Sequence, residues 1–150
     1  MSEERALLLI KPDAMQKQLA GNIIAEIYHL KLKMIGLKLV NVKRELAELH
    51  YQEHKSKPFY SELIDYITGK LHGKESVIAI AYKGENAAQK LREYAGKTNP
   101  ELAHPTSLRG RYGRIISTNN QMDNVVHISD SAENGDREIK LWFKKEELIE

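Results

Sequence analysis

Cysteine is absent from the 150 residues. Proline is scarce, with four residues, and aromatic residues make up only 7% of the chain. The lack of cysteine excludes disulfide bonds, thiol catalysis and cysteine-ligated zinc. The apolar run nearest the N-terminus spans only Ala6 to Ile10 and follows charged residues, which fits neither a signal peptide nor a membrane span. We therefore expect a cytoplasmic protein with no membrane partner.

A strong charge of one sign is also lacking. The formal net charge is +2, which is too small by itself to indicate a nucleic-acid partner. The hydrophobic fraction of 41% and the charged fraction of 29% are ordinary for a globular protein. The length favours one domain over residues 1–150.

The hydrophobic pattern alternates predicted strands and helices. Strands are predicted at 6–10, 33–43, 76–82 and 125–128, and helices at 22–30, 45–53, 61–67, 86–94 and 131–143. Asn22 is the expected cap of the first helix. Residues 97–123 show little periodicity and predict a long functional loop.

This order of elements predicts an α+β, ferredoxin-like fold. The expected β-α-β-β-α-β arrangement is a four-stranded antiparallel sheet with helices packed on it and a C-terminal helix. The alternative is a doubly wound parallel fold, which usually needs more than four strands.

Three short motifs indicate other functions only weakly. Residues 69–75 resemble a Walker A loop, but the glycine spacing is one residue short and Glu75 stands where serine or threonine would bind magnesium. His50 and His54 have helical spacing, yet a solvated pair is a better interpretation than zinc ligands. Gly110–Gly113 resembles a nucleic-acid-clamping turn, and a lone four-residue match is weak.

The segment from Asn124 to Ser131 carries the most informative residue, His127. An apolar pair before the histidine predicts a buried strand, and small and acidic residues after it predict a strand-to-helix turn. A neutral imidazole in such a turn can attack phosphorus without first losing a proton. Glu138, eleven residues on, is placed to orient the second ring nitrogen. The alternative for His127 is a core histidine satisfied by a backbone partner, and the alternative for Glu138 is an exposed charge on a helix.

Several cationic and polar residues suit phosphate binding. Lys11 directly follows the first strand, Arg92 lies on a helix, and Thr98 and Arg109 lie in the long loop. Arginine binds phosphate through a planar fork and lysine through a point charge. Each one alone is an ordinary surface residue, and their joint placement favours a site. Phe59 is predicted either to stack on a flat ring or to join two helices.

Six segments in one order resemble nucleoside diphosphate kinases, and the resemblance covers about residues 5–143. These segments are Ala6–Asp13, His50-Tyr51, Lys57–Phe59, Gly96–Pro100, Leu108–Gly110 and Asn124–Ser131. Each motif is short, but six in register are highly specific.

The resemblance implies an enzyme that passes the γ-phosphate of a nucleoside triphosphate, such as ATP, through a histidine to a nucleoside diphosphate in a ping-pong cycle. His127 would be the nucleophile, Glu138 its orienting carboxylate, and Ser129 a support. The phosphates and sugar would be surrounded by Lys11, Tyr51, Arg92, Thr98, Arg109 and Asn124, and Phe59 would stack on the base. Mg²⁺ would arrive with the nucleotide, with Asp130 and Glu53 as outer contacts only. The family assembles as hexamers or tetramers built from dimers, which implies a homo-oligomer.

Some positions depart from the family's pattern. Ile128 replaces a usual glycine after the histidine, Thr106-Ser107 replaces Gly-Thr, and Arg111 replaces a common acidic residue. The stretches at 70–75 and 115–123 are longer than usual. Two alternatives follow: a catalytically impaired nucleotide-binding or regulatory protein on the same fold, and a nucleic-acid-binding module.

Overall fold

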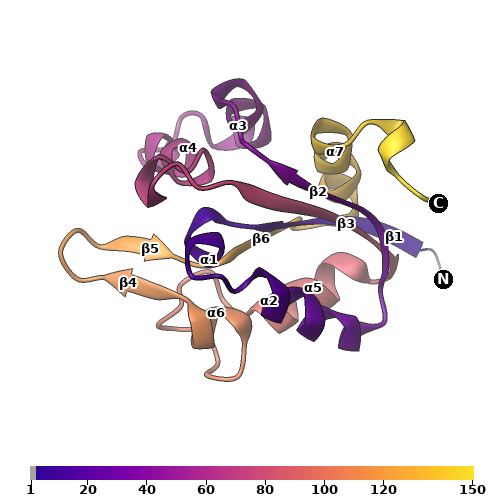
Figure 1. Ribbon diagram of the computed structural model, residues 1–150, viewed down its shortest axis with the longest axis horizontal. Coiled ribbons are helices and arrows are strands. Elements are labelled where there is room, and N and C mark those ends of the chain that lie inside the picture. The colour runs from indigo at the N-terminus through magenta and orange to yellow at the C-terminus, as the bar shows by residue number, and fades with distance from the viewer. Residues whose placement is uncertain (1–2) are drawn as a thin grey trace.

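The protein is seen here in a computed structural model that describes residues 3–150 (Figure 1). The strands are β1 (Glu3–Ile10), β2 (Lys33–Val40), β3 (Val77–Glu85), β4 (Arg114–Ile116), β5 (Gln121–Asp123) and β6 (Val126–Ile128). The helices are α1 (Pro12–Gln16), α2 (Ala20–Ile27), α3 (Arg44–His50), α4 (Tyr60–Ile67), α5 (Ala87–Ala95), α6 (Leu108–Tyr112) and α7 (Ala132–Trp142). Short 3₁₀ turns are η1 (Tyr28–Leu30), η2 (Gln52–His54), η3 (Lys70–His72) and η4 (Lys145–Glu147).

The main sheet confirms the predicted ferredoxin-like topology. Its strand order is β2-β3-β1-β6, and the three pairings are antiparallel. Among residues 3–150, no helix has the length and apolar character needed to cross a membrane.

Helices cover both faces of the sheet, so β1 is buried on both sides. Leu8 and Ile10 point into a cluster with residues of α2 and α5, whereas Leu7 and Leu9 point into a cluster with residues of α3, α4 and α7. Figure 1 shows these two groups of helices on opposite sides of the sheet. A strand covered on both faces has a continuous apolar sequence, and this explains why 6–10 shows no alternation.

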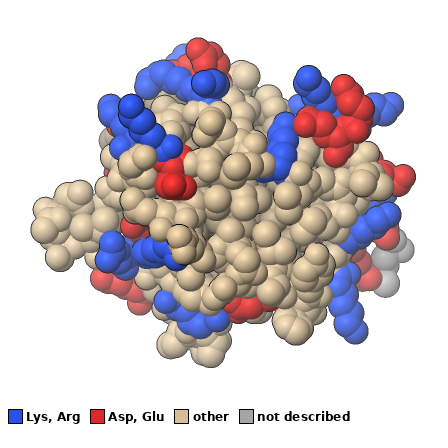
Figure 2. All heavy atoms as spheres, in the orientation of Figure 1, with Lys and Arg blue, Asp and Glu red and all other residues tan. Residues whose placement is uncertain are grey.

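The prediction of a long irregular loop at 97–123 is wrong. This segment contains α6 and the two-stranded β4–β5 sheet, which forms a hairpin that projects from the molecule (Figure 1). Asn120 turns the hairpin with a φ of 56°, and the Asn119 side chain accepts a hydrogen bond from the Gln121 backbone N–H. Three-residue strands are too short to produce a periodic pattern. The hairpin end is an uncharged projection in Figure 2.

Two further differences concern helix starts. Helix α1 was not predicted, although Pro12 occupies its first turn, where its missing N–H costs nothing. Asn22 does not cap α2, because the helix begins earlier and Leu19 is the N-cap residue.

Gly135 allows α7 to lie directly on β1. A Cβ atom at this position would lie 2.1 Å from the Arg5 carbonyl oxygen, whereas a Cβ at Gly21 in α2 would have no atom within 4 Å. We expect Gly135→Ala to lower the free energy of unfolding by about 1–3 kcal/mol, because the backbones would have to separate. Gly21→Ala is the matched control and should raise it by roughly 0.5–1 kcal/mol through helix propensity. Urea unfolding of both variants measures this, and equal effects would contradict the close approach.

Candidate active site

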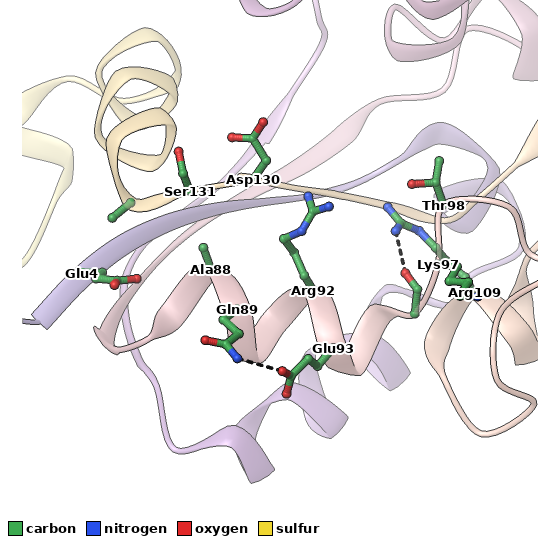
Figure 3. A pocket seen from close by; sticks show the side chains of 12 residues that line it. Glu4, Ala88, Gln89, Arg92, Glu93, Lys97, Thr98, Arg109, Asp130 and Ser131 are labelled. Carbon is green, nitrogen blue, oxygen red and sulfur yellow. Dashed lines mark hydrogen bonds between the residues drawn. The ribbon is translucent and has the colours of Figure 1, made fainter.

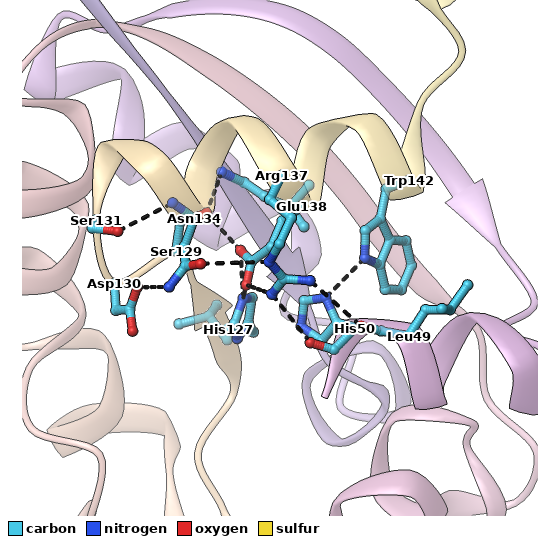
Figure 4. A network of polar contacts seen from close by, with 12 residues as sticks. Leu49, His50, His127, Ser129, Asp130, Ser131, Asn134, Arg137, Glu138 and Trp142 are labelled. Carbon is cyan, nitrogen blue, oxygen red and sulfur yellow. Dashed lines mark hydrogen bonds and ion pairs between the residues drawn. The ribbon is translucent and has the colours of Figure 1, made fainter. Parts of the chain in front are cut away.

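His127 lies in β6 opposite Leu9 of β1, and one of its ring nitrogens is held by α7. Its Nε2 atom is 3.0 Å and 3.2 Å from the two carboxylate oxygens of Glu138 (Figure 4). Ser129 donates to the same carboxylate at 2.6 Å, and the Leu7 backbone N–H donates to the Ser129 hydroxyl at 2.9 Å. A carboxylate only accepts, so Nε2 carries the proton and Nδ1 keeps its lone pair.

The Glu138 carboxylate is almost fully buried yet remains ionised. Burial alone would raise its pKa, but the charge and hydrogen bond of His127, together with Ser129 and Arg137, hold the pKa below its usual value. The side chain of Arg137 also reaches the backbone carbonyl oxygens of Leu49 and His50. The imidazole of His127 is therefore fixed by an anion that Ser129 and Arg137 hold in turn.

His50 packs against the ring of His127. The prediction of a solvated pair of His50 and His54 is therefore wrong for His50. The His50 side chain is buried, and its ring centroid lies 4.4 Å from that of His127 in an edge-on arrangement. Its Nδ1 accepts a hydrogen bond from the Trp142 indole at 3.0 Å. Burial and the neighbouring His127 lower the pKa of His50 well below its usual value, so His50 is a neutral wall of the site.

His127 lines a pocket of about 400 Å³. The pocket gathers most of the predicted site residues from distant segments: Lys11, Tyr51, Glu53, Phe59, Arg92, Thr98, Arg109, Asn124, His127, Asp130 and Glu138. His50, His54, Leu63 and Ile128 also line it. Ser129 does not line this pocket, and its hydroxyl contacts the pocket residue Glu138 through a hydrogen bond.

Lys11 is buried although it is a lysine. Its ammonium donates to the Asn124 side-chain oxygen at 2.8 Å and lies 4.4 Å from the centre of the Tyr66 ring. Burial and the nearby Arg109 lower the pKa of Lys11 to about 7, against the opposing effect of Asp13 and Asp123. A buried ammonium with one hydrogen bond has donors left for an anionic ligand.

Arg109 is anchored by the backbone. Its guanidinium donates to the carbonyl oxygens of Gly96, Asn124 and Val126 at 2.7–3.1 Å. These contacts use three of its five N–H donors and leave the remainder for the pocket. Burial and the charge of Arg92 lower the pKa of Arg109 to about 10, so it remains a cation near neutral pH.

Arg92 and Thr98 are exposed and face open space. They also line an adjoining pocket of about 750 Å³, together with Arg109 and Asp130 (Figure 3). The Thr98 carbonyl oxygen accepts from the Asn124 side chain at 3.3 Å. The larger pocket is an open continuation of the site beyond these residues.

Asp13 and Tyr66 fix the backbone before His127, and sequence reasoning missed both. Tyr66 donates to Asp13 at 2.5 Å and accepts from the Asn124 backbone N–H, and Asp13 also accepts from the Val125 backbone N–H. Val125 has a φ of 74°, which is strained for a β-branched residue. The available sequence feature was Pro12-Asp13 directly after the apolar run that ends at Ile10.

The remaining predicted residues lie at the edges of the pocket. Tyr51 is buried, its ring centroid is 6.3 Å from that of His127, and burial raises the pKa of its hydroxyl. Phe59 is 44% exposed, so its ring is available for stacking and does not join two helices in the core. Ile128 belongs to the core and leaves the contact between His127 and Glu138 intact.

The longer stretches meet each other beside the site. His72 of η3 lies with its Nε2 2.9 Å from Asp123 at the end of β5, and Gln121 donates to the same carboxylate oxygen at 3.0 Å. All three side chains are buried. This cluster holds the hairpin in place next to Asn124, and the local pattern around His72 gave no indication of it.

Arg111 of the suspected nucleic-acid turn and Arg109, which flanks it, are both engaged within the protein. Arg109 binds backbone carbonyl oxygens, and Arg111 forms an ion pair with Glu26. Lysines and arginines are intermixed with acidic residues on the face shown in Figure 2. The turn therefore offers few free cations to a nucleic-acid backbone.

The carboxylates and histidines have different capacities for metal. His50, His127 and Glu138 are close enough to hold an ion, but Nε2 of His127 already binds Glu138 and Nδ1 of His50 already binds Trp142. Asp130 and Glu53 are exposed at the pocket wall and offer the oxygen ligands that Mg²⁺ prefers. The donor set fits a magnesium ion carried in by phosphates better than a metal held by protein alone.

Comparisons with known proteins agree with this geometry. The family model described as nucleoside diphosphate kinase matches residues 4–148. The nucleoside diphosphate kinase of Pyrococcus horikoshii is 46% identical over 151 residues, covering 100% of this chain and 92% of the relative. That of Staphylococcus haemolyticus is 48% identical, covering 97% and 91%.

Solved structures give the same result. A halophilic nucleoside diphosphate kinase from Halobacterium salinarum in complex with CDP has a TM-score of 0.87 at 34% identity, covering 99% of this chain and 93% of that one. A transition-state mimic of the Borrelia burgdorferi enzyme with bound vanadate and ADP has a TM-score of 0.88 at 26% identity, covering 99% and 91%. This chain belongs to the nucleoside diphosphate kinase family of phosphotransferases.

Proposed function

We propose that this chain performs the family's phosphoryl transfer through Nδ1 of His127, with ATP as one donor. The single observation that carries this is the one-sided imidazole: Glu138 occupies Nε2, whereas Nδ1 has no hydrogen-bond partner among residues 3–150, and the ring lines a pocket together with Lys11, Arg92 and Arg109. In the first half-reaction a bond forms between Nδ1 and the γ-phosphorus while the bond to the bridging oxygen breaks. The departing nucleoside diphosphate keeps that oxygen and its electron pair, and a second diphosphate then reverses the exchange.

The residues around His127 have separate roles in this proposal. Lys11, Arg92 and Arg109 stabilise the charge on the phosphoryl oxygens as it develops. Asn124, Tyr51 and Thr98 bind phosphates and sugar, and Phe59 stacks on the base. Ser129 and Glu138 orient the imidazole without touching the substrate. Initial rates with varied donor and acceptor test this scheme, because a covalent intermediate requires parallel double-reciprocal lines.

Magnesium is the proposed cofactor. Bound to the nucleotide phosphates, Mg²⁺ neutralises part of their charge during transfer. Asp130 and Glu53 would contact its water ligands from the pocket wall. Chelation by EDTA should abolish transfer from ATP, and added Mg²⁺ should restore it.

Lys11→Met should lower the activity of the site and raise the stability of the fold. Loss of the ammonium should lower kcat/KM about a hundredfold, because one donor to the phosphoryl group is removed. The same variant should unfold at a higher temperature at pH 6, because a lysine whose pKa is lowered to about 7 is charged at a penalty in the folded state.

The sign of the pH effect follows from the two pKa values. The folded value is about 7 and the unfolded reference is 10.5, so between them the unfolded chain holds more protons at Lys11. The wild-type free energy of unfolding therefore rises through this range relative to Lys11→Met. The stability difference should be largest below pH 7 and small above 10.5. Thermal unfolding across this range checks it, and a constant difference would contradict the buried ammonium.

We further propose one domain over the whole chain, a cytoplasmic location, and a homo-oligomer built from dimers as hexamer or tetramer. The exposed leucines Leu37 and Leu39 lie on β2, at the edge of the sheet, and support association. The Ile149 backbone N–H donates to the Ile35 carbonyl oxygen of this strand, and an edge strand whose remaining length is open is a surface for pairing. Light scattering measures the mass, and a monomer at micromolar concentration would contradict this proposal.

A further inference from the structure

A cleft of about 420 Å³ runs from Lys11 outward between α4 and β5. Its two walls follow the periodicity of their elements. Glu62, Leu63 and Tyr66 line it from one face of α4, and so does Phe59, the N-cap residue, with the spacing of successive helical turns. Asn120, Met122 and Asn124 line it from β5 and its flanking residues, with the two-residue repeat of a strand.

The chemistry of the cleft changes along its length. Lys11, Thr98 and Asn124 form the polar inner part, and these three residues are shared with the pocket of His127, as are the apolar Phe59 and Leu63. Phe59, Leu63 and Met122 make the middle apolar. Glu62 and Asn120 are exposed at the outer part. A flat ring attached to a polyphosphate fits this order, because stacking uses the apolar middle while the phosphates reach the inner end.

The outer polar groups are free to bind a ligand. Within residues 3–150, no hydrogen-bond or ion-pair partner contacts the side chain of Glu62 or Asn120. The carboxylate of Glu62 accepts two hydrogen bonds in parallel, and the amide of Asn120 both donates and accepts. Stacking alone is tolerant of base identity, so these two groups are the available source of discrimination.

We propose that Glu62 and Asn120 read the pairing edge of the base and favour guanine nucleotides. Guanine presents two adjacent donors, N1–H and the N2 amino group, which match one carboxylate, and beside them the O6 acceptor, which matches the amide of Asn120. The other common bases lack this pair of adjacent donors next to an acceptor. This inference rests on the proposed function, since it requires the base to lie in the cleft, and Glu62 and Asn120 act as specificity-determining residues.

The test compares GDP with IDP as acceptors, because the two differ only in the N2 amino group. We expect kcat/KM of the wild type to favour GDP over IDP by about three- to tenfold, the size of one typical hydrogen bond, because the contact is exposed to water. Glu62→Gln should bring this ratio close to one by lowering the value for GDP. Asn120→Gly removes the amide and tolerates the positive φ of the hairpin turn, and it should lower both values together and keep their ratio, because both bases carry O6.

Glu45→Gln is the matched control. Glu45 and Glu62 are both exposed acidic residues in the first turn of a helix, but Glu45 does not line the cleft. Equal use of GDP and IDP by the wild type, or equal ratios in the two glutamine variants, would overturn the inference while leaving phosphoryl transfer intact. Absence of transfer to every diphosphate would instead contradict the proposed function.

Discussion

His127→Ala should lose phosphoryl transfer by roughly 10⁵-fold or more, since the covalent route has no other nucleophile. His50 is the nearest imidazole, but it is buried, and its Nδ1 is bound to Trp142. The variant should still bind ADP, because Lys11, Arg109 and Phe59 remain. A coupled assay with ATP and several diphosphates measures the rate, and equilibrium dialysis measures the binding.

His29→Ala is the control for this variant. His29 is exposed in η1 and lies outside the pocket of His127. Its transfer rate should equal that of the wild type. Transfer by His127→Ala at more than about a hundredth of the wild-type rate would show a direct route between nucleotides, because loss of an essential nucleophile costs far more than that.

Glu138→Gln should lower kcat by about 10³–10⁴-fold while the protein remains folded. The change is nearly isosteric, but an amide donates as well as accepts. The imidazole is then no longer held with its proton on Nε2, and the proton on Nδ1 removes the attacking lone pair. The loss should appear in kcat with little change in KM, because Glu138 orients His127 and does not bind the nucleotide in this account. Single-turnover formation of phosphoenzyme measures the affected step.

Glu133→Gln is the matched change on the exposed first turn of the same helix and should leave kcat unaltered. Ser129→Ala gives an intermediate case, because Glu138 loses one donor but keeps its charge. A kcat for Glu138→Gln within tenfold of the wild type would contradict the tautomer argument.

The fold was largely predictable because its signals are local. β1 is an uninterrupted apolar run, α5 begins after Asn86 and ends at Gly96, and Ser131 caps α7 by accepting from the Asn134 backbone. Short elements were missed where three residues are too few to establish a period. The predicted start of α2 at Asn22 was wrong because asparagine, a good capping residue, here lies inside the helix.

The candidate site was predictable in its residues and unpredictable in its contacts. The position of Lys11 directly after a strand and that of Arg109 in the long loop pointed to these two residues. That Arg109 is anchored by three backbone carbonyl oxygens depends on tertiary packing of distant segments. The same holds for His50 against His127 and for His72 against Asp123, whose sequence separations leave no local pattern.

The most direct test of the central claim is phosphorus NMR of the ATP-treated protein with nitrogen-15 in its histidines. A phosphoryl group coupled to Nδ1 of a single imidazole, lost in His127→Ala, is the expected spectrum. A phosphoryl group on Nε2, on another side chain or on no residue at all would contradict an attacking nitrogen that Glu138 leaves free.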